Sequence, residues 1–239
     1  MILTGKEAAA RIDISVVRTH HSHKDILEVV ELAKKYRFIN VHVLPCWVSD
    51  LAVLLRGVEG VYVGAPVGFP SGAATTLTKM VEAEQMLHDG VEEMDIVMNV
   101  GKLKAGEKAY VLHELRQIIG MTDGKVKTKV IIETRALEEG EIYAACDIAI
   151  ASGADFVKTG TGWIPGTLDL DQVRRIREHC GSDIQLKVAG GVRTREEFIA
   201  LMEMGVERVG INAVSAVEIV KALNEHPYYG REEAASLLA

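Results

Sequence analysis

The chain has 239 residues, of which 48% are hydrophobic and 26% are charged, a balance typical of globular proteins. Its net charge of −7 and pI near 5.7 argue against binding to nucleic acid or to an anionic membrane surface. The first residues lack the apolar segment of a signal peptide, and we expect no membrane span. The three cysteines are far apart and lack a CxxC spacing, which indicates reduced thiols in a cytoplasmic protein.

Short β-branched segments alternate along the chain with segments of helical periodicity. The predicted strands cover residues 11–15, 39–44, 61–67, 93–100, 127–134, 155–160, 184–190 and 208–213. Their spacing, roughly 22 to 34 residues, suits one strand followed by one helix each time.

The helical segments have recognisable ends. The helix after residue 75 is predicted to stop at Gly90, and its buried face to consist of Leu77, Met80, Val81, Met86 and Leu87. Further helices are predicted to begin after Asp169 and after Thr194, where Glu197 completes a capping-box pattern.

Eight alternating strand–helix units in about 240 residues predict a (β/α)8 TIM barrel. No linker or low-complexity segment divides the chain, so we expect a single domain over residues 1–239 with a polar tail from about residue 225 to 239. The competing fold is an open doubly wound sheet. That fold has fewer strands and a GxGxxG loop after its first strand, which is missing here.

Polar residues recur at one parity in several predicted strands. In the fourth strand Asp95 shares a face with Asn99, and in the sixth and seventh strands Lys158 and Lys187 alternate with apolar neighbours. Because the opposite parity must pack under the helices, these polar side chains are expected to point into the barrel. The fifth strand places Lys129 and Glu133 in the same way.

Two lysines and a carboxylate inside a barrel allow two interpretations. The first is a self-neutralising network with a structural role. The second is catalytic: burial and a neighbouring ammonium group both lower a lysine pKa, so one amine becomes free near neutral pH and can form a Schiff base with a carbonyl compound. Lys158 would be that amine, Lys187 its electrostatic partner, and Asp95 a proton-transfer group.

The segments "EMDIVMNVGKLKAGE", "KVIIETRAL", "GADFVKTGTGW" and "LKVAGGVRT", with "VGFPSGAATT", resemble the deoxyribose-phosphate aldolases. The similarity runs from about Ile12 to Val220. It implies a class I, metal-independent aldolase with Lys158 as the Schiff-base lysine, Lys187 as its partner and Asp95 as the proton relay. The implied reaction is reversible cleavage of 2-deoxy-D-ribose 5-phosphate to acetaldehyde and D-glyceraldehyde 3-phosphate.

The sequence departs from the family at several positions. Gly160 replaces a serine of "KTSTG", Arg18 replaces the lysine of "IDHTLLKP", and His42 lies where the family often has "VCVNP". The turn after the last strand reads "GINAV" where the family has a "GTSSG"-like sequence, so Asn212 and Ala213 replace two hydroxyl donors. These differences leave the catalytic residues in place and alter the residues that bind the phosphate.

We therefore expect the substrate phosphate to be bound by other groups. The backbone amides of Gly162, Gly190 and Gly191 and a helix N-terminus after the last strand can receive a dianion. Asn212 is expected to donate a hydrogen bond, and Arg18 a charge-assisted one if its loop folds inward. His42 is expected at the barrel mouth, as a satisfied polar residue or as a catalytic acid.

Other residues support weaker interpretations. The histidines of "HHSH" (His20, His21 and His23) suggest either a metal site or a solvent-exposed loop with Ser22 near a helix N-cap. Cys46 has no neighbouring base in sequence that would make it a nucleophile.

Glu133 is expected to support the site or to pair with Arg135 or Lys129. Tyr228 and Tyr229 lie in the polar tail. In the family a C-terminal tyrosine can reach the active site, but this tail ends in alanine.

The sequence thus predicts an aldolase with no metal and no cofactor, acting on small aldehydes and sugar phosphates. It also predicts a cytoplasmic homo-oligomer without nucleic-acid or membrane partners. Two alternatives remain open: a related aldolase for another aldose phosphate or a sugar acid, and a barrel that binds a sugar phosphate without catalysis.

Overall fold

The computed structural model describes residues 2–122 and 124–230. Eight parallel strands close into a barrel in chain order, which confirms the (β/α)8 prediction and excludes the open sheet. The barrel strands are β2 (Ile12–Val16), β3 (Asn40–Val43), β4 (Tyr62–Val67), β5 (Glu93–Val97), β6 (Lys127–Ile131), β7 (Phe156–Lys158), β8 (Gln185–Ala189) and β9 (Arg208–Ile211). Each lies within one to three residues of its predicted limits.

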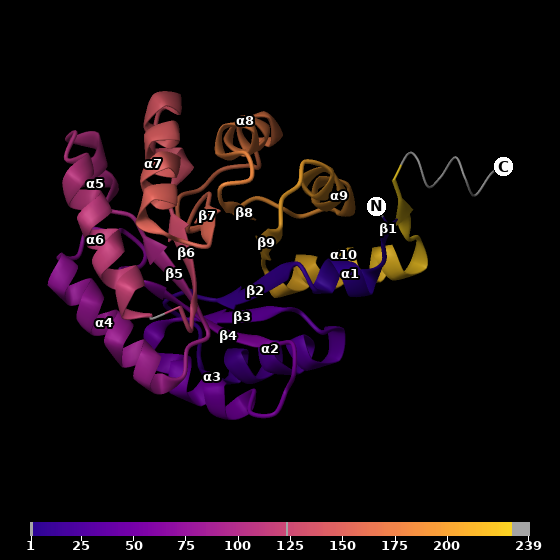
Figure 1. The fold of residues 1–239 in the computed structure, drawn as a ribbon. Coiled ribbons are helices and arrows are strands. Elements are labelled where there is room, and N and C mark those ends of the chain that lie inside the picture. The colour runs from indigo at the N-terminus through magenta and orange to yellow at the C-terminus, as the bar shows by residue number, and fades with distance from the viewer. Residues whose placement is uncertain (1, 123, 231–239) are drawn as a thin grey trace.

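The helices surround the strands and form an outer ring (Figure 1). They are α1 (Gly5–Ala9), α2 (His23–Tyr36), α3 (Val48–Leu54), α4 (Thr76–Asp89), α5 (Val100–Lys104), α6 (Lys108–Met121), α7 (Glu139–Ser152), α8 (Leu170–Cys180), α9 (Arg195–Glu203) and α10 (Ala213–Glu225). Short 3-10 helices, η1 (Pro45–Trp47) and η2 (Thr134–Ala136), follow β3 and β6. In the described residues no helix is long and apolar enough to cross a membrane.

The predicted helix ends are confirmed. Asp169 caps α8, Thr194 forms a capping box with Glu197 at α9, and Gly90 ends α4 in the left-handed conformation, with φ of 94°.

The buried face of α4 differs from its prediction. Met86 is buried and Met80 and Leu87 pack partly buried against the core, as predicted, whereas Leu77 and Val81 are 70% and 57% exposed. The helix turns instead so that Lys79 and Ala83 are buried. The reason is an ion pair: Lys79 contacts Glu114 of α6 beneath the helix, and this contact determines which side of α4 faces inward.

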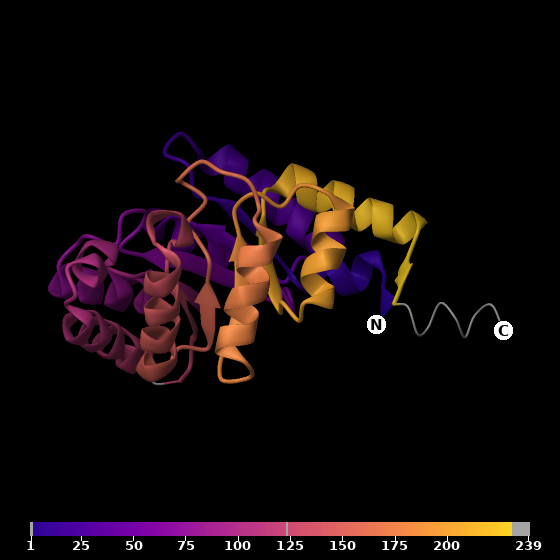
Figure 2. The same ribbon diagram turned by 90° about the horizontal axis from the view of Figure 1, so that it is seen from above.

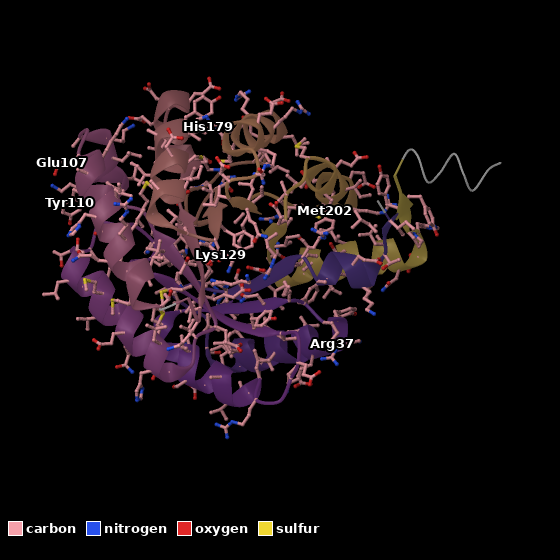
Figure 3. The ribbon with its side chains drawn as sticks, in the orientation of Figure 1. Arg37, Glu107, Tyr110, Lys129, His179 and Met202 are labelled. Carbon is pink, nitrogen blue, oxygen red and sulfur yellow. The ribbon has the colours of Figure 1, made fainter. Side chains whose placement is uncertain are left out.

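The two faces of each strand have different surroundings. Outward side chains such as Val130, Val157 and Leu186 join the hydrophobic core beneath the helices. Inward side chains include Lys129, which lies in the middle of the ring of helices in Figure 3. In contrast, Glu107 and Tyr110 lie at the outer rim in that view.

The first and last strands of the described residues lie side by side on the amino-terminal side of the barrel (Figure 2). Strand β1 (Ile2–Leu3) pairs antiparallel with β10 (Tyr228–Tyr229), and the hydroxyl of Tyr228 donates to Glu203. The two tyrosines therefore lie at the end of the barrel opposite the carboxyl ends of the strands. Part of the predicted tail, residues 231–239, lies outside the described residues.

Candidate active site

A cavity of about 440 Å³ opens at the carboxyl ends of the barrel strands. Its floor contains side chains from the barrel interior: Asp13, His42, Lys158 and Lys187. Its walls come from the loops above and include Arg18, Phe69, Gly162, Gly190 and Asn212. The carboxyl end of the strands is where TIM barrels carry their active sites.

Lys158 and Lys187 are direct neighbours across the β7–β8 ladder, with paired Cα atoms. Lys158 is 7% exposed, and its Nζ donates to Asp95 Oδ2 at 2.8 Å. Burial lowers the pKa of Lys158 to about 8; Asp95 opposes the shift, and Lys187 and Lys129 add to it. About one tenth of Lys158 is therefore an uncharged amine at pH 7, far more than for an ordinary lysine.

Asp95 links the two lysines. Its Oδ2 accepts from Lys187 Nζ at 2.9 Å as well as from Lys158, and its Oδ1 lies 3.2 Å from Lys129 Nζ. Burial alone would raise the pKa of Asp95, but the surrounding cationic side chains hold that pKa well below its usual value. Asp95 is thus a firmly ionised carboxylate in contact with the candidate nucleophile.

A second group of charges lies beneath this one. Lys187 Nζ contacts Asp13 at 2.5 Å, and Arg208 bridges Asp13 at 2.6 Å and Glu93 at 2.7 Å. Lys129 Nζ donates to Glu93 at 2.6 Å. Lys187 and Arg208 hold the pKa of Asp13 below its usual value, although burial opposes them.

The connected network contains one more cation than carboxylates. The acids are Asp13, Glu93 and Asp95, and the bases are Lys129, Lys158, Lys187 and Arg208. Asp95 and Glu93 raise the pKa of Lys129 despite its burial, so Lys129 stays protonated. Loss of the Lys158 proton makes the network neutral, which suits an interior position.

His42 extends from β3 to the same carboxylate. Its Nε2 lies 3.2 Å from Asp95 Oδ2, and its Nδ1 lies 2.5 Å from Asn40 Oδ1. Burial lowers the pKa of His42 to about 4, against the opposing effect of Asp95, so the ring is neutral at pH 7. Gly64 of β4 makes room for it, because a Cβ there would overlap the His42 ring.

Arg18 is expected to bind the phosphate only if its loop folds inward, and the loop does fold toward the cavity. Its Nη2 donates to the carbonyl of Gly162 at 2.9 Å, and its guanidinium lies 5.6 Å from the centre of the Trp163 ring. Trp163 also contacts Phe69 edge-on and donates from Nε1 to the carbonyl of Val17. These contacts join three loops at the rim of the cavity.

Asn212 is the N-cap of α10. Its Oδ1 accepts from the amide of Ser215 and its Nδ2 donates to Ser215 Oγ, each at 3.0 Å. Asn212 lines the cavity together with Ala213 and Val214, the first residues of the helix, whose amides have no partner within the helix. The helix N-terminus is therefore the stronger anion-binding element here.

Gly190 lines the cavity, whereas Gly191 does not. A Cβ at Gly191 would lie 2.6 Å from the Leu168 amide, and φ is +102°. The glycine at position 191 is therefore required by the close approach of the loop that contains Leu168, and not by a place in the cavity wall.

The histidine loop has the contacts of a helix start, one of its two predicted roles. Ser22 caps α2 in a capping box with Asp25, as expected for a helix start. His21 accepts from the Arg18 amide, and His23 packs on Trp47. Within residues 2–122 and 124–230 no group of three His, Cys, Asp or Glu side chains is arranged to hold a metal ion. Cys46 is exposed in η1 and does not line the cavity.

Of the two alternatives for Glu133, the structure agrees with support of the site and not with pairing to Arg135 or Lys129. Glu133 has φ of 54°, which turns its carboxylate to the amide of Thr161 at 3.2 Å and to the Thr161 hydroxyl. Arg135 instead donates to loop carbonyls. A Cβ at Gly160 would lie 2.9 Å from Glu133 Oε1, so Glu133 occupies the space that a side chain at residue 160 would need.

Sequence reasoning missed several residues of the site. Glu93, Arg208 and Asn40 belong to the charge network, and Phe69 and Arg193 line the cavity. Strand parity would have found Glu93, which is two residues before Asp95. Asn99, predicted to share the face of Asp95, instead caps α5 with its side chain.

Comparisons with known proteins agree with this geometry. Residues 63–216 match the model of the DeoC/LacD family aldolases. A deoxyribose-phosphate aldolase 1 of Bacillus licheniformis is 40% identical over 224 residues, covering 94% of this chain and 99% of that protein. This chain belongs to the DeoC/LacD family of aldolases.

Solved structures of the family have the same fold. A putative deoxyribose-phosphate aldolase from Coccidioides immitis superposes with a TM-score of 0.87 at 30% identity, over 93% of this chain and 87% of that one. The deoxyribose phosphate aldolase from Aeropyrum pernix, described as a unique tetrameric structure, has a TM-score of 0.83 at 25% identity, over 92% of each chain.

Proposed function

We propose that this family member is a class I aldolase that reversibly cleaves 2-deoxy-D-ribose 5-phosphate to acetaldehyde and D-glyceraldehyde 3-phosphate. The observation that carries the proposal is Lys158, an amine with a pKa lowered to about 8 on the floor of the cavity. The names of the relatives, deoxyribose-phosphate aldolases, support the choice of substrate.

In the synthetic direction the Lys158 amine attacks the carbonyl carbon of acetaldehyde. The carbinolamine loses water to give an iminium ion, and loss of a proton from the adjacent carbon gives an enamine. The enamine attacks the aldehyde carbon of glyceraldehyde 3-phosphate, and hydrolysis then releases the sugar phosphate. Cleavage is the same sequence reversed.

Asp95 and Lys187 surround the nitrogen at which this chemistry occurs. Asp95 Oδ2 contacts Lys158 Nζ and stabilises the cationic iminium nitrogen that forms in its place. Lys187 Nζ contacts the same oxygen and keeps Lys158 partly deprotonated. We assign to this pair the transfer of protons, through water, as the carbinolamine and the enamine form.

The phosphate is assigned to the wall of the cavity above. Arg18, the amides of Gly162 and Gly190, and the N-terminus of α10 beside Asn212 supply a charge and several donors. Arg193 adds a second cation at the same mouth. These groups replace the two hydroxyls that the turn after β9 lacks.

One experiment tests the Schiff base directly. The protein is incubated with acetaldehyde and reduced with borohydride, and the modified peptide is identified by mass spectrometry. We expect the adduct on Lys158, and none on Lys79, a buried lysine outside the cavity. A folded protein without a Lys158 adduct would leave only the non-catalytic alternative.

A second experiment tests the substrate. Turnover of 2-deoxyribose with and without the 5-phosphate is compared in wild type and Arg18→Ala. Loss of a charge-assisted hydrogen bond, about 1.5 to 3 kcal/mol, should raise KM for the phosphorylated sugar roughly 10- to 100-fold and leave the other unchanged. Equal effects on both sugars would favour a different aldose phosphate or a sugar acid.

The remaining assignments concern the state of the protein in the cell. A cytoplasmic homo-oligomer is proposed, and the tetramer of the Aeropyrum pernix aldolase supports the oligomer. Light scattering after gel filtration measures the mass. Full activity in excess chelator would agree with a metal-independent mechanism.

A further inference from the structure

The loop that follows Lys158 has no regular structure of its own. Residues 159–169, between β7 and α8, contain neither helix nor strand. The loop brings Gly162 to the wall of the active-site cavity, where Arg18 holds the Gly162 carbonyl from the cavity side. Because an irregular loop lacks a hydrogen-bond ladder, its shape depends on bonds to other parts of the barrel.

Residues 133–135, directly after β6, bond this loop at four points. The amide of Thr134 donates to the carbonyl of Thr159 at 2.8 Å. The carboxylate of Glu133 accepts from the amide of Thr161 at 3.2 Å and from the Thr161 hydroxyl. Glu133 is buried, and these donors satisfy its charge. The other two points belong to Arg135.

Arg135 reaches furthest along the loop. Its Nη1 donates to the carbonyl of Ile164 at 2.7 Å, and its Nη2 donates to the carbonyl of Thr167 at 2.9 Å. The same Nη2 donates to the carbonyl of Gly190 at 3.3 Å, in the turn after β8. A guanidinium group is planar and its donors point in fixed directions, so it fixes the carbonyls around it relative to one another. Arg135 therefore fastens the loop after β7 to the turn after β8.

Arg135 lies behind the wall of the active-site cavity. It lines a second cavity of about 270 Å³ and does not line the first. Ala189 and Gly190 line both cavities and therefore separate them. A Cβ built on Gly190 would lie 3.3 Å from Arg135 Nη1 and 3.6 Å from the Cα of Gly162. The guanidinium thus supports, from the rear, the place where the two glycines of the wall approach each other.

We propose that Arg135 is a positioning residue that sets the spacing of the Gly162 and Gly190 amides and thereby the preference for a phosphorylated substrate. This inference rests on the phosphate site proposed above. Donors that already point at a dianion bind it better than donors that must first be ordered. In the described part of the chain Arg135 donates to loop carbonyls and to no charged group of the cavity floor, so the chemistry at Lys158 should not depend on it.

The test compares two sugars in a matched pair of variants. Arg135→Met removes the three contacts. Arg116→Met removes an arginine of α6 that likewise donates to a carbonyl, that of Ala151, outside the cavity. In Arg135→Met we expect KM for 2-deoxyribose 5-phosphate to rise about 10-fold, with kcat and the KM for unphosphorylated 2-deoxyribose changed less than about twofold. All three should be unchanged in Arg116→Met.

A binding measurement separates the phosphate site from turnover. Isothermal titration calorimetry with inorganic phosphate needs no reaction at Lys158. We expect the dissociation constant to be about 10-fold higher in Arg135→Met and unchanged in Arg116→Met. Arg135→Lys keeps the positive charge but lacks the planar fork of donors, so its dissociation constant should lie between those of wild type and Arg135→Met.

The outcomes are distinguishable. An equal rise in KM for both sugars, or an unchanged dissociation constant for phosphate in Arg135→Met, overturns the positioning role. Full recovery in Arg135→Lys also overturns it, because charge and not position would then control the site. A wild type that is trapped on Lys158 but does not bind phosphate contradicts the role of Arg135 alone. A wild type that binds phosphate but forms no adduct contradicts the proposed function instead.

Discussion

Two buried lysines in this molecule have different surroundings. Lys79, fully buried between α4 and α6, pairs with Glu114 at 2.7 Å and donates to the Val97 carbonyl at 2.9 Å. Burial lowers its pKa, and Glu114 opposes the shift. Lys158 has the same direction of shift but shares its carboxylate with other cations and faces a cavity.

The difference shows that burial alone does not make a lysine a nucleophile. Lys79 has one carboxylate to itself and no opening to admit a carbonyl compound, so it ties α4 to α6 and to the end of β5. Lys158 competes with Lys187 and Lys129 for Asp95. The number of cations per carboxylate, and access to the cavity, therefore separate a structural lysine from a reactive one.

The largest expected effect is on activity. Lys158→Met should reduce kcat by about 10⁴-fold or more, the order seen when a covalent nucleophile is removed. Lys79→Met, the matched change at the other lysine, should retain an active site that is trapped by borohydride. Comparable losses in the two variants, with both folded, would contradict the distinction.

The next effect is on stability, and here Lys79 is expected to matter more than Lys158. Lys79→Met leaves Glu114 buried without its cation and should lower the free energy of unfolding by about 3 to 5 kcal/mol. Urea unfolding followed by circular dichroism measures it. In the double variant Lys79→Met/Glu114→Leu much of the loss should return; if the double variant is no more stable than the single one, the pair is not an isolated unit.

Stability should also depend on pH through Lys158. Its pKa is lowered from 10.5 to about 8 in the folded protein. The unfolded chain therefore binds more protons between these values, and stability rises with pH across that window. Relative to Lys158→Met, the wild type should gain up to about 3 kcal/mol from pH 8 to 10.5. Parallel pH profiles would mean that Lys158 is an ordinary lysine.

The smallest effect is a displaced titration. The rate of borohydride trapping should rise with pH around 8, because only the free amine attacks. Lys187→Met removes a cation that lowers the pKa of Lys158, so its midpoint should move to higher pH. Lys221→Met, on α10, provides a surface control. If the midpoint of the trapping rate does not move in Lys187→Met, burial alone would account for the lowered pKa of Lys158.

The fold and the inward residues could be predicted from the sequence because both depend on short-range pattern. Strand alternation alone predicts that Asp95, Lys158 and Lys187 lie on the barrel interior. The buried side of α4 could not be predicted, because a lysine is normally expected at the surface. Lys79 can be buried only because Glu114 of α6, distant in sequence, pairs with it.

The loops were less predictable for a related reason. The direction of Glu133 depends on one backbone angle, φ of 54°, that no pattern of residue types reveals. Asn212 is predicted to donate to a ligand, but its side chain bonds Ser215, three residues away at the start of α10. Parity predicts which way a strand residue points, whereas a residue after the strand end follows its local turn.

Gly64 has a consequence for the history of the family. A side chain there would collide with His42 and Asn40, so position 64 can gain one only if both of those side chains move or change. A relative with smaller residues at positions 40 and 42 has room for a side chain at position 64, and one with asparagine and histidine does not. Comparing the three positions across relatives tests whether they vary together.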